Sequence, residues 1–429
     1  MLHASPVRGV RRGSLIGRRR VQIVGALVIS ALLPFLLRAL LYPGTADENT
    51  TLNTLSGNII AVALAMWVRM SVETYPGVRA SSLNLPVATA SHAAVMVAIL
   101  LLRIPYDRLG LTGGYLLHLI WLYVTFFLAE RRAVYTIAVV PFGQIEDLAR
   151  IEKVEWVRMA APRLDSILHC DAIVADFGGD LPAEWEAFLA DAALAGRIVY
   201  QVKQLSESLT GRVEIEHISE NSFGSLLPAR GYFHLKEMID FLAALVLLPV
   251  ALLLLPFVAM AIVIEDRGPV FFRQRRVGFA GHPIDVLKFR TMRPIILCAD
   301  DNLRDAAMTV TDDVRITRVG AFLRRTRLDE FPQIFNILAG QMSWIGPRPE
   351  AQILSVWYTA EIAFYRYRHV VKPGISGWAQ VNQGHVAGVD DVHRKLQYDF
   401  YYIKYFSPWL DVLILFRTVK TIVTGFGSR

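Results

Sequence analysis

The chain is poor in cysteine, with Cys170 and Cys298 the only two among 429 residues. Two cysteines cannot form the disulfide framework of a small secreted protein, and no Cys-based zinc motif is present. No nucleic-acid-binding signature occurs, so a nucleic-acid partner is not expected. Internal repeats and low-complexity tracts are also lacking. These absences favour a reducing compartment and leave apolar segments and charged motifs as the informative features.

Apolar residues are abundant. They make up 54% of the chain, too much for an ordinary soluble enzyme, and the formal net charge is +7. The length suggests two or three domains. A basic, apolar chain suits an anionic membrane surface or phosphorylated substrates. We therefore expect a lipid bilayer as one partner.

Four apolar segments occupy the first 132 residues, at 21–42, 55–72, 85–104 and 115–129. Each is close to the roughly 20 residues that a bilayer crossing needs. Arginines precede the first segment and follow the last, and such residues collect on the cytoplasmic side. A signal peptide also begins with basic and apolar residues, but this first segment is too long and no small-residue cleavage site follows it. Residues 1–132 are predicted to form four transmembrane helices.

Residues 133–227 are less apolar and have the pattern of a small Rossmann-like α/β domain. Strand-like segments at 135–140, 171–175 and 197–201 alternate with helical spacing at 181–194, which favours a parallel sheet. A dinucleotide site would carry a glycine fingerprint after the first strand, where this chain has only VPFG. A structural or dimerising domain, compatible with a homodimer, is therefore preferred to a nucleotide sensor.

A fifth apolar run, at 241–264, is long enough to cross a membrane. A crossing would place the motif-rich remainder outside, away from any cytoplasmic activated substrate. Pro249 and Pro256 offer an alternative, because proline breaks a helix. Each half would have about 10 residues and a length of about 15 Å, about half of a hydrocarbon core of about 30 Å. We predict a re-entrant helix at about 234–264, leading into a domain at 228–429.

Short motifs dense in cations follow this run. They are GPVFFRQRRVG (268–278), LKFRTM (287–292), RRTRLDEFPQIFNIL (324–338), MSWIGPRPE (342–350) and KPGISGWAQVN (372–382). One guanidinium group can donate two parallel hydrogen bonds to the oxygens of a phosphate. For any single cation, the alternative is a place on a solvated basic face. The candidates for phosphate contact are Arg273, Arg275, Arg276, Lys288, Arg290, Arg324 and Arg348. Arg348 is the sharpest, because a proline on each side restricts its backbone.

Among these cations lies one adjacent acidic pair, Asp329 and Glu330. Neighbouring side chains on a helix point apart, so the two carboxylates can do different work. One can attack phosphorus as a covalent nucleophile, and the other can hold a divalent cation that neutralises a diphosphate. The alternative is an acidic pair that only stabilises the start of a helix.

These motifs resemble those of the bacterial sugar transferases, the monotopic polyprenyl-phosphate hexose-1-phosphate transferases. The resemblance covers about residues 233–423 and rests on GPVFFRQRRVG, KFRTM, LDEFPQ, IGPRP, PGISGWAQV and YDFYYIKY. The preceding segments are similar to the long form of the family, which initiates exopolysaccharide, capsule or O-antigen synthesis. The resemblance also implies the re-entrant helix and a place in the bacterial inner membrane, with the catalytic domain on the cytoplasmic face.

The resemblance implies a reaction and roles for individual residues. Asp329 would attack the sugar-bearing phosphate of a UDP-sugar, with UDP-glucose or UDP-galactose expected, and expel UMP. Undecaprenyl phosphate would then take the phosphosugar. Glu330 is the expected Mg²⁺ ligand, Arg348 a phosphate or nucleotide contact, and Gln333 and Asn336 further substrate contacts.

Three departures from the family's usual motifs are present. Glu237 follows Lys236 where an arginine is usual, Arg327 replaces a serine before the acidic pair, and Val314 replaces a proline. None alters Asp329 or Glu330. Two rival functions stay open: a membrane glycosyltransferase, which would release UDP, and a non-catalytic scaffold for polysaccharide assembly.

Overall fold

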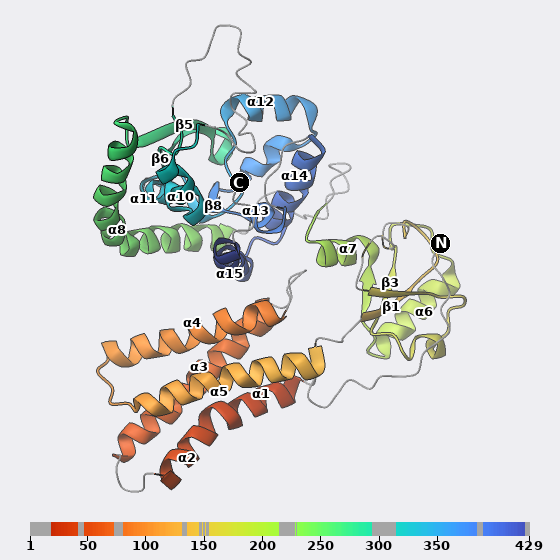
Figure 1. Ribbon diagram of the computed structural model, residues 1–429. Helices are drawn as coiled ribbons and strands as arrows, with labels where there is room; N and C mark the ends of the chain where they lie inside the picture. Colours follow the sequence, from red (N-terminus) through yellow and green to blue (C-terminus); the bar gives the residue numbers. More distant parts are fainter. Residues whose placement is uncertain are drawn as a thin grey trace. The chain divides into compact units, whose positions relative to one another are not determined.

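The computed structural model describes residues 19–41, 47–72, 80–130, 135–145, 148, 151, 154–213, 228, 230–293, 315–383 and 389–424. The chain divides into two compact units, Met1–Gly211 and Arg212–Arg429, whose elements are labelled in Figure 1. Cys298 and Val314 lie outside the described residues.

Long apolar helices open the N-terminal unit. In chain order they are α1 (Arg19–Leu27), η2 (Val28–Leu32), α2 (Leu33–Leu41), α3 (Glu48–Val72), α4 (Ala80–Leu101), α5 (Arg108–Thr125) and η3 (Phe126–Glu130). Within the described residues, five helices are long and apolar enough to cross a membrane, and four of them are formed by these elements. The expectation of a membrane-associated protein with several apolar helices is confirmed, and the four crossings stay a prediction.

Small and large apolar side chains together fill the contacts among these helices. Ala26 of α1, Val62 of α3, Ala88 of α4 and Leu122 of α5 belong to one buried cluster. In lipid, where apolar burial alone does not drive association, small residues let helix backbones approach closely. Larger apolar side chains such as Leu40 lie on the outside. This distribution suits helices that are surrounded by lipid.

A four-stranded parallel sheet follows in the same unit. Its strands are β1 (Tyr135–Val139), β2 (Val154–Arg158), β3 (Ala172–Ala175) and β4 (Val199–Gln201), in the order β2-β1-β3-β4. The predicted parallel sheet is confirmed, although the sequence analysis did not predict β2. Ile173 packs in one cluster with α6 (Ala183–Leu194), and Val174 packs in another with α7 (Val202–Thr210). Neighbouring strand residues face opposite sides, so helices cover both faces.

The C-terminal unit combines one long helix, two small sheets and a set of short helices. Its sheets are antiparallel β5 (Phe271–Val277) with β6 (Pro283–Phe289), and parallel β7 (Ser343–Ile345) with β8 (Gly374–Ser376). Its helices are α8 (Arg230–Asp266), η7 (Phe279–Gly281), α10 (Arg318–Thr326), η8 (Leu328–Gln333), α11 (Ile334–Leu338), α12 (Gln352–Glu361), η9 (Tyr365–Val370), α13 (Trp378–Gln383), α14 (Val389–Lys404) and α15 (Pro408–Thr424). One core joins Ala244 and Ala251 of α8 to Val286 of β6 and Ile334 of α11.

Helix α8 contains the fifth apolar run. It has 37 residues with Pro249 and Pro256 inside it, and Figure 1 shows it bent into two arms. A proline removes one backbone hydrogen bond and crowds the preceding turn, which is a recognised cause of helix bending. The sequence predicted a helix that breaks at these prolines, and the structure instead has a bend within one helix. The re-entrant placement stays a prediction.

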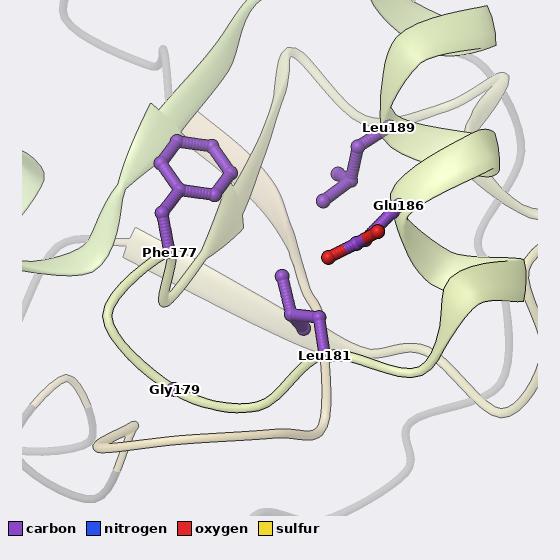
Figure 2. Close-up of a pocket in the computed structure, with 5 residues that line it drawn as sticks. All are labelled: Phe177, Gly179, Leu181, Glu186 and Leu189. Atoms are coloured by element: carbon purple, nitrogen blue, oxygen red, sulfur yellow. The ribbon is translucent and has the colours of Figure 1, made fainter.

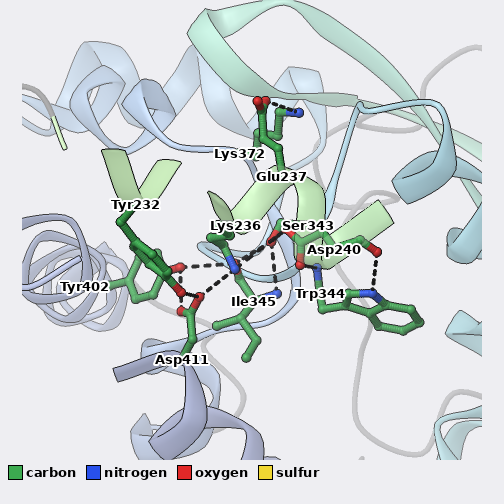
Figure 3. Close-up of polar contacts among 10 residues, drawn as sticks. All are labelled: Tyr232, Lys236, Glu237, Asp240, Ser343, Trp344, Ile345, Lys372, Tyr402 and Asp411. Carbon is green, nitrogen blue, oxygen red and sulfur yellow. Dashed lines mark hydrogen bonds and ion pairs between the residues drawn. The ribbon is translucent and has the colours of Figure 1, made fainter. Parts of the chain in front are cut away.

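One face of α8 is polar and is fixed to the rest of the unit (Figure 3). Tyr232, Lys236 and Asp240 are four residues apart and therefore lie above one another on the helix. Lys236 Nζ lies 2.7 Å from Asp411 Oδ2, which also accepts a 2.5 Å hydrogen bond from the Tyr232 hydroxyl. Asp240 accepts a 2.6 Å bond from Ser343 Oγ. These bonds join α8 to α15 and β7.

Candidate active site

The acidic pair lies on a 3₁₀-helix between two α-helices. Helix α10 ends at Thr326, and Arg327 adopts a left-handed conformation with φ of 61°. Helix η8 then carries Asp329 and Glu330. Successive side chains of a 3₁₀-helix are about 120° apart. The two carboxylates therefore point in different directions and meet different surroundings.

Glu330 is enclosed by two cations. Its side chain is 5% exposed, and Oε1 lies 2.6 Å from Arg348 Nη2 and 2.9 Å from Lys288 Nζ. Burial favours the neutral acid, but the two ion pairs outweigh burial and hold the pKa of Glu330 well below its ordinary value. Glu330 is therefore a carboxylate at neutral pH. Three predicted site residues, from β6, η8 and the loop after β7, meet at this point.

Asp329 has different surroundings. Its Oδ1 atom is buried and has no hydrogen-bond partner among the described residues. Burial raises the pKa of Asp329, and the neighbouring Glu330 carboxylate raises it further. An unpaired buried polar group costs roughly 1–3 kcal/mol, and such a cost calls for an explanation. One explanation is that this carboxylate oxygen is kept free to react or to bind a ligand.

The pKa values of the two cations beside Glu330 are shifted in opposite directions. Burial lowers the pKa of Lys288 to about 8, although Glu330 opposes that shift. Glu330 raises the pKa of Arg348 above its ordinary value. Because arginine keeps its charge in proteins, Arg348 is the permanent cation of the pair. Together they reduce the repulsion that two bare carboxylates would exert on a phosphate.

Asn336 has a place in the site that the sequence did not predict. Its Oδ1 accepts a 3.1 Å hydrogen bond from Leu287 N, and its Nδ2 donates to Asp285 O at 2.8 Å. These bonds hold two backbone groups of β6, at Asp285 and Leu287, directly before Lys288. Gln333, at 2% exposed, is buried on the same 3₁₀-helix as the acidic pair. Substrate contact by Gln333 or Asn336 stays a prediction.

Four of the predicted phosphate ligands take no part in the contacts around Glu330. Arg276 donates to Pro349 O and to Gln274 Oε1, and Arg290 lies 3.1 Å from the carboxylate of Asp266. The other two are Arg273, which is exposed on β5, and Arg324, whose Nη1 is buried without a partner among the described residues. Within the described part of the chain, no hydrogen bond or ion pair joins any of the four to the acidic pair. Their phosphate-binding roles stay predictions.

A second buried ionic cluster, not evident from the sequence, lies in the C-terminal unit. Arg368 Nη2 lies 2.8 Å from Asp399 Oδ2, and Lys395 pairs with Glu350. Burial opposes ionisation of Glu350, but Lys395 and Arg368 lower its pKa to about 2. Glu350 and Asp399 belong to the motifs MSWIGPRPE and YDFYYIKY, yet nothing in the sequence indicated that they are buried. Arg368 and Lys395 carried no signal at all.

Hollows occur in the described parts of both the α/β domain and the C-terminal unit. One lies in the α/β domain, between α6 and the loop after β3, and Figure 2 shows Phe177, Leu181, Glu186 and Leu189 around it. None of the predicted site residues lines this hollow. The second is a small cavity beside the site, and its lining residues are Val277, Pro347, Arg348, Pro349, Arg368, His369, Val371 and Pro373.

The acidic pair suits a magnesium ion that substrate phosphates also bind, rather than an all-protein metal site. Among the described residues, no three His, Cys, Asp or Glu side chains converge as an all-protein metal site requires. Mg²⁺ commonly uses one or two carboxylates together with substrate phosphates. The unpartnered oxygen of Asp329 and the adjacent Glu330 carboxylate provide such donors. The donor set suits an ion that arrives with a diphosphate.

The described structure is that of a membrane-associated protein whose site places Asp329, with one oxygen unpartnered among the described residues, beside a buried Glu330 carboxylate paired with two cations. The family model described as bacterial sugar transferase matches residues 231–425. The UDP-N-acetylgalactosamine-undecaprenyl-phosphate N-acetylgalactosaminephosphotransferase of Aeromonas hydrophila is 43% identical over 378 residues, which is 88% of each chain. The chain belongs to the bacterial sugar transferase family, so the resemblance inferred from the motifs is confirmed.

Other relatives match only part of the chain. The UDP-glucose:undecaprenyl-phosphate glucose-1-phosphate transferase of Escherichia coli K12 is 41% identical over 187 residues, 43% of this chain and 39% of its own. The enzyme of the same name from Xanthomonas campestris is 44% identical over 174 residues, 40% of this chain and 34% of its own.

Proposed function

We propose that this protein transfers a sugar-1-phosphate from a UDP-sugar to undecaprenyl phosphate through a covalent intermediate on Asp329. The observation that carries the proposal is the buried Asp329 oxygen without a partner, beside a Glu330 carboxylate that is held by two cations. The relatives named above support the reaction, since their names describe undecaprenyl-phosphate sugar phosphotransferases. The transfer would be an early membrane step of exopolysaccharide, capsule or O-antigen synthesis.

The reaction has two displacements at the same phosphorus. The Asp329 carboxylate attacks the sugar-bearing phosphorus of the UDP-sugar, the bond from that phosphorus to the bridging oxygen breaks, and UMP leaves with both electrons. An oxygen of undecaprenyl phosphate then attacks the phosphorus of the aspartyl phosphosugar. The bond to Asp329 breaks, which restores the carboxylate and gives undecaprenyl diphosphosugar. Two easier steps replace one direct transfer.

Glu330, Lys288 and Arg348 support both steps. Arg348 and Lys288 place positive charge where the phosphate oxygens must pass, and fixed charges of this kind stabilise charge that develops in a transition state. Magnesium, held by Glu330 and the diphosphate, would neutralise charge on the phosphates and on departing UMP. Because Glu330 stays ionised, its charge also keeps the two cations in position.

The motifs do not identify the sugar of the donor, and UDP-glucose and UDP-galactose were the donors expected first. The relative that matches 88% of the chain, however, is named for N-acetylgalactosamine, while the glucose-named relatives match 40% and 43%. We propose UDP-N-acetylgalactosamine as the first donor to test, with UDP-glucose and UDP-galactose next.

We also propose that α8 re-enters the membrane and keeps the active site at the cytoplasmic face of the inner membrane. The apolar run at 241–264 would measure about 36 Å if straight, enough to cross a core of about 30 Å, so the case for re-entry rests on the shape and the anchoring of α8. Its bend, the two prolines inside it and its anchored polar face all suit a helix that dips in and returns. A site there meets a soluble nucleotide and a lipid phosphate.

The nucleotide product tests the proposal. Purified enzyme receives undecaprenyl phosphate, Mg²⁺ and, in separate reactions, labelled UDP-N-acetylgalactosamine, UDP-glucose or UDP-galactose. We expect UMP, with label moving to the lipid, and the fastest donor identifies the sugar. Release of UDP would instead identify a glycosyltransferase. A lack of turnover with every UDP-sugar would favour the scaffold.

A further inference from the structure

The loop that carries Arg348, residues 346–350, is held at four consecutive backbone carbonyls. We call it the Pro-Arg-Pro loop. Its outer two carbonyls accept bonds from backbone groups: Pro347 O accepts from Gly374 N at 3.0 Å, and Glu350 O accepts from Val277 N at 3.1 Å. Strand β5 and the start of β8 therefore fix both ends of the loop.

The inner two carbonyls accept from arginine side chains. Arg348 O accepts a 2.9 Å hydrogen bond from Arg368 Nη2, and Pro349 O accepts from Arg276 Nη1. The loop thus bonds from its backbone to two arginines, while the side chain of Arg348 reaches Glu330. A short loop held at every one of these carbonyls has little freedom to move.

Arg368 is itself locked in place. Its side chain is 3% exposed, its Nη1 donates to the Tyr365 hydroxyl at 2.8 Å, and its Nη2 lies 2.8 Å from Asp399 Oδ2. The one guanidinium group therefore contacts the Tyr365 hydroxyl, the Asp399 carboxylate and the Arg348 carbonyl. A lysine keeps the charge but cannot reproduce this planar set of donors. Burying such a cation is costly unless its geometry is well satisfied.

Resting on the proposed function, we propose that Arg368 and Arg276 are positioning residues that act through Arg348. They hold the backbone of the Pro-Arg-Pro loop so that the Arg348 guanidinium stays at Glu330, next to the phosphorus that Asp329 attacks. Neither contacts the substrate. This assigns to Arg276 a role other than the phosphate contact expected from its motif.

Conservative variants separate this role from general stability. In Arg368→Lys and Arg276→Lys, we expect kcat to fall by about 100-fold, the scale of a misplacement of about 1 Å, with a smaller change in KM. Arg366→Lys is the matched control for Arg368→Lys, because it alters an exposed arginine of the same 3₁₀-helix. This control should turn over at the wild-type rate.

A double-mutant cycle with Arg348→Ala gives the decisive result. If Arg368 acts through Arg348, adding Arg368→Lys to Arg348→Ala should cause no further loss of kcat. Losses that multiply would overturn the proposal, and so would a fall in activity that only follows the fraction of folded enzyme. Failure of the proposed function would be seen separately, as an absence of UMP release by the wild type.

Hydrogen exchange provides a readout that does not depend on turnover. Amides in the Pro-Arg-Pro loop should exchange faster in Arg368→Lys than in wild type or Arg366→Lys, because one of the loop's anchors is weakened. Equal exchange in all three proteins would contradict the positioning role.

Discussion

Two carboxylates of the C-terminal unit, the half-buried Asp329 and the buried Asp411, differ in how their oxygens are satisfied. Asp411 Oδ1 accepts from the Tyr402 hydroxyl at 2.9 Å, and its Oδ2 accepts from Lys236 and Tyr232. Asp329 Oδ1 has no partner among the described residues. A satisfied buried carboxylate holds elements together, as Asp411 does for α8 and α15 (Figure 3). An unsatisfied one is available for chemistry.

The largest expected effect is at the unsatisfied carboxylate. Asp329→Asn should reduce UMP release by about a thousandfold or more, because an amide is a poor nucleophile. The melting temperature in detergent should stay at or above the wild-type value, since the substitution breaks no hydrogen bond of Oδ1 and removes a buried charge. Turnover close to that of wild type would contradict the assignment of Asp329.

The satisfied carboxylate should behave in the opposite way. Asp411→Asn leaves Lys236 buried without its 2.7 Å partner, so we expect a loss of about 3 kcal/mol in unfolding free energy. Activity per folded molecule should change only a few-fold. Urea or thermal unfolding in detergent, with UMP release measured on the same samples, checks both.

Replacing both partners is the control for that prediction. Lys236→Met combined with Asp411→Leu should recover part of the stability, because no buried ammonium is left without Asp411, while Asp240, which loses its 3.8 Å ion pair with Lys236, keeps its bond from Ser343 Oγ. If Asp411→Asn is as stable as wild type but inactive, the contrast between the two carboxylates is wrong.

The smallest expected effect is a pH dependence at Glu350, whose folded pKa of about 2 lies below its ordinary value of 4.5. The stabilisation is fully present well above pH 4.5 and is lost as the pH falls toward 2. Between pH 7 and pH 4 the loss should be on the order of 1 kcal/mol. Glu350→Gln should lower stability at pH 7 and flatten this slope. A slope in Glu350→Gln equal to that of wild type would rule out Glu350 as the titrating group.

Local sequence signals predicted part of the architecture. Apolar length identified the helices that can cross a membrane, and alternating patterns placed three of the four strands of the parallel sheet. Strand β2 was missed because its residues, VEWVR, are only partly buried and carry charges that hide the strand pattern. The prolines of α8 predicted a change of direction, but the sequence did not show that one helix would continue through it.

The site could be predicted where its residues lie in short motifs of charged residues. Asp329, Glu330, Lys288 and Arg348 lie in motifs dense in acidic and basic residues, and the structure joins Glu330 to both cations. The direction in which an arginine points is set by tertiary contacts. That is why the sequence could not tell Arg276, which donates to Pro349 O, from a phosphate ligand.

The most direct test of the central claim is to trap the phosphosugar on the enzyme. Wild type and Asp329→Asn are mixed with a UDP-sugar that carries ³²P in the sugar-bearing phosphate, together with Mg²⁺ but without undecaprenyl phosphate, and are then quenched. Our account predicts about one equivalent of UMP per wild-type enzyme, with label bound covalently at Asp329 and passed to undecaprenyl phosphate when it is added. Transfer that proceeds only with both substrates present, with no label on the protein, would contradict it.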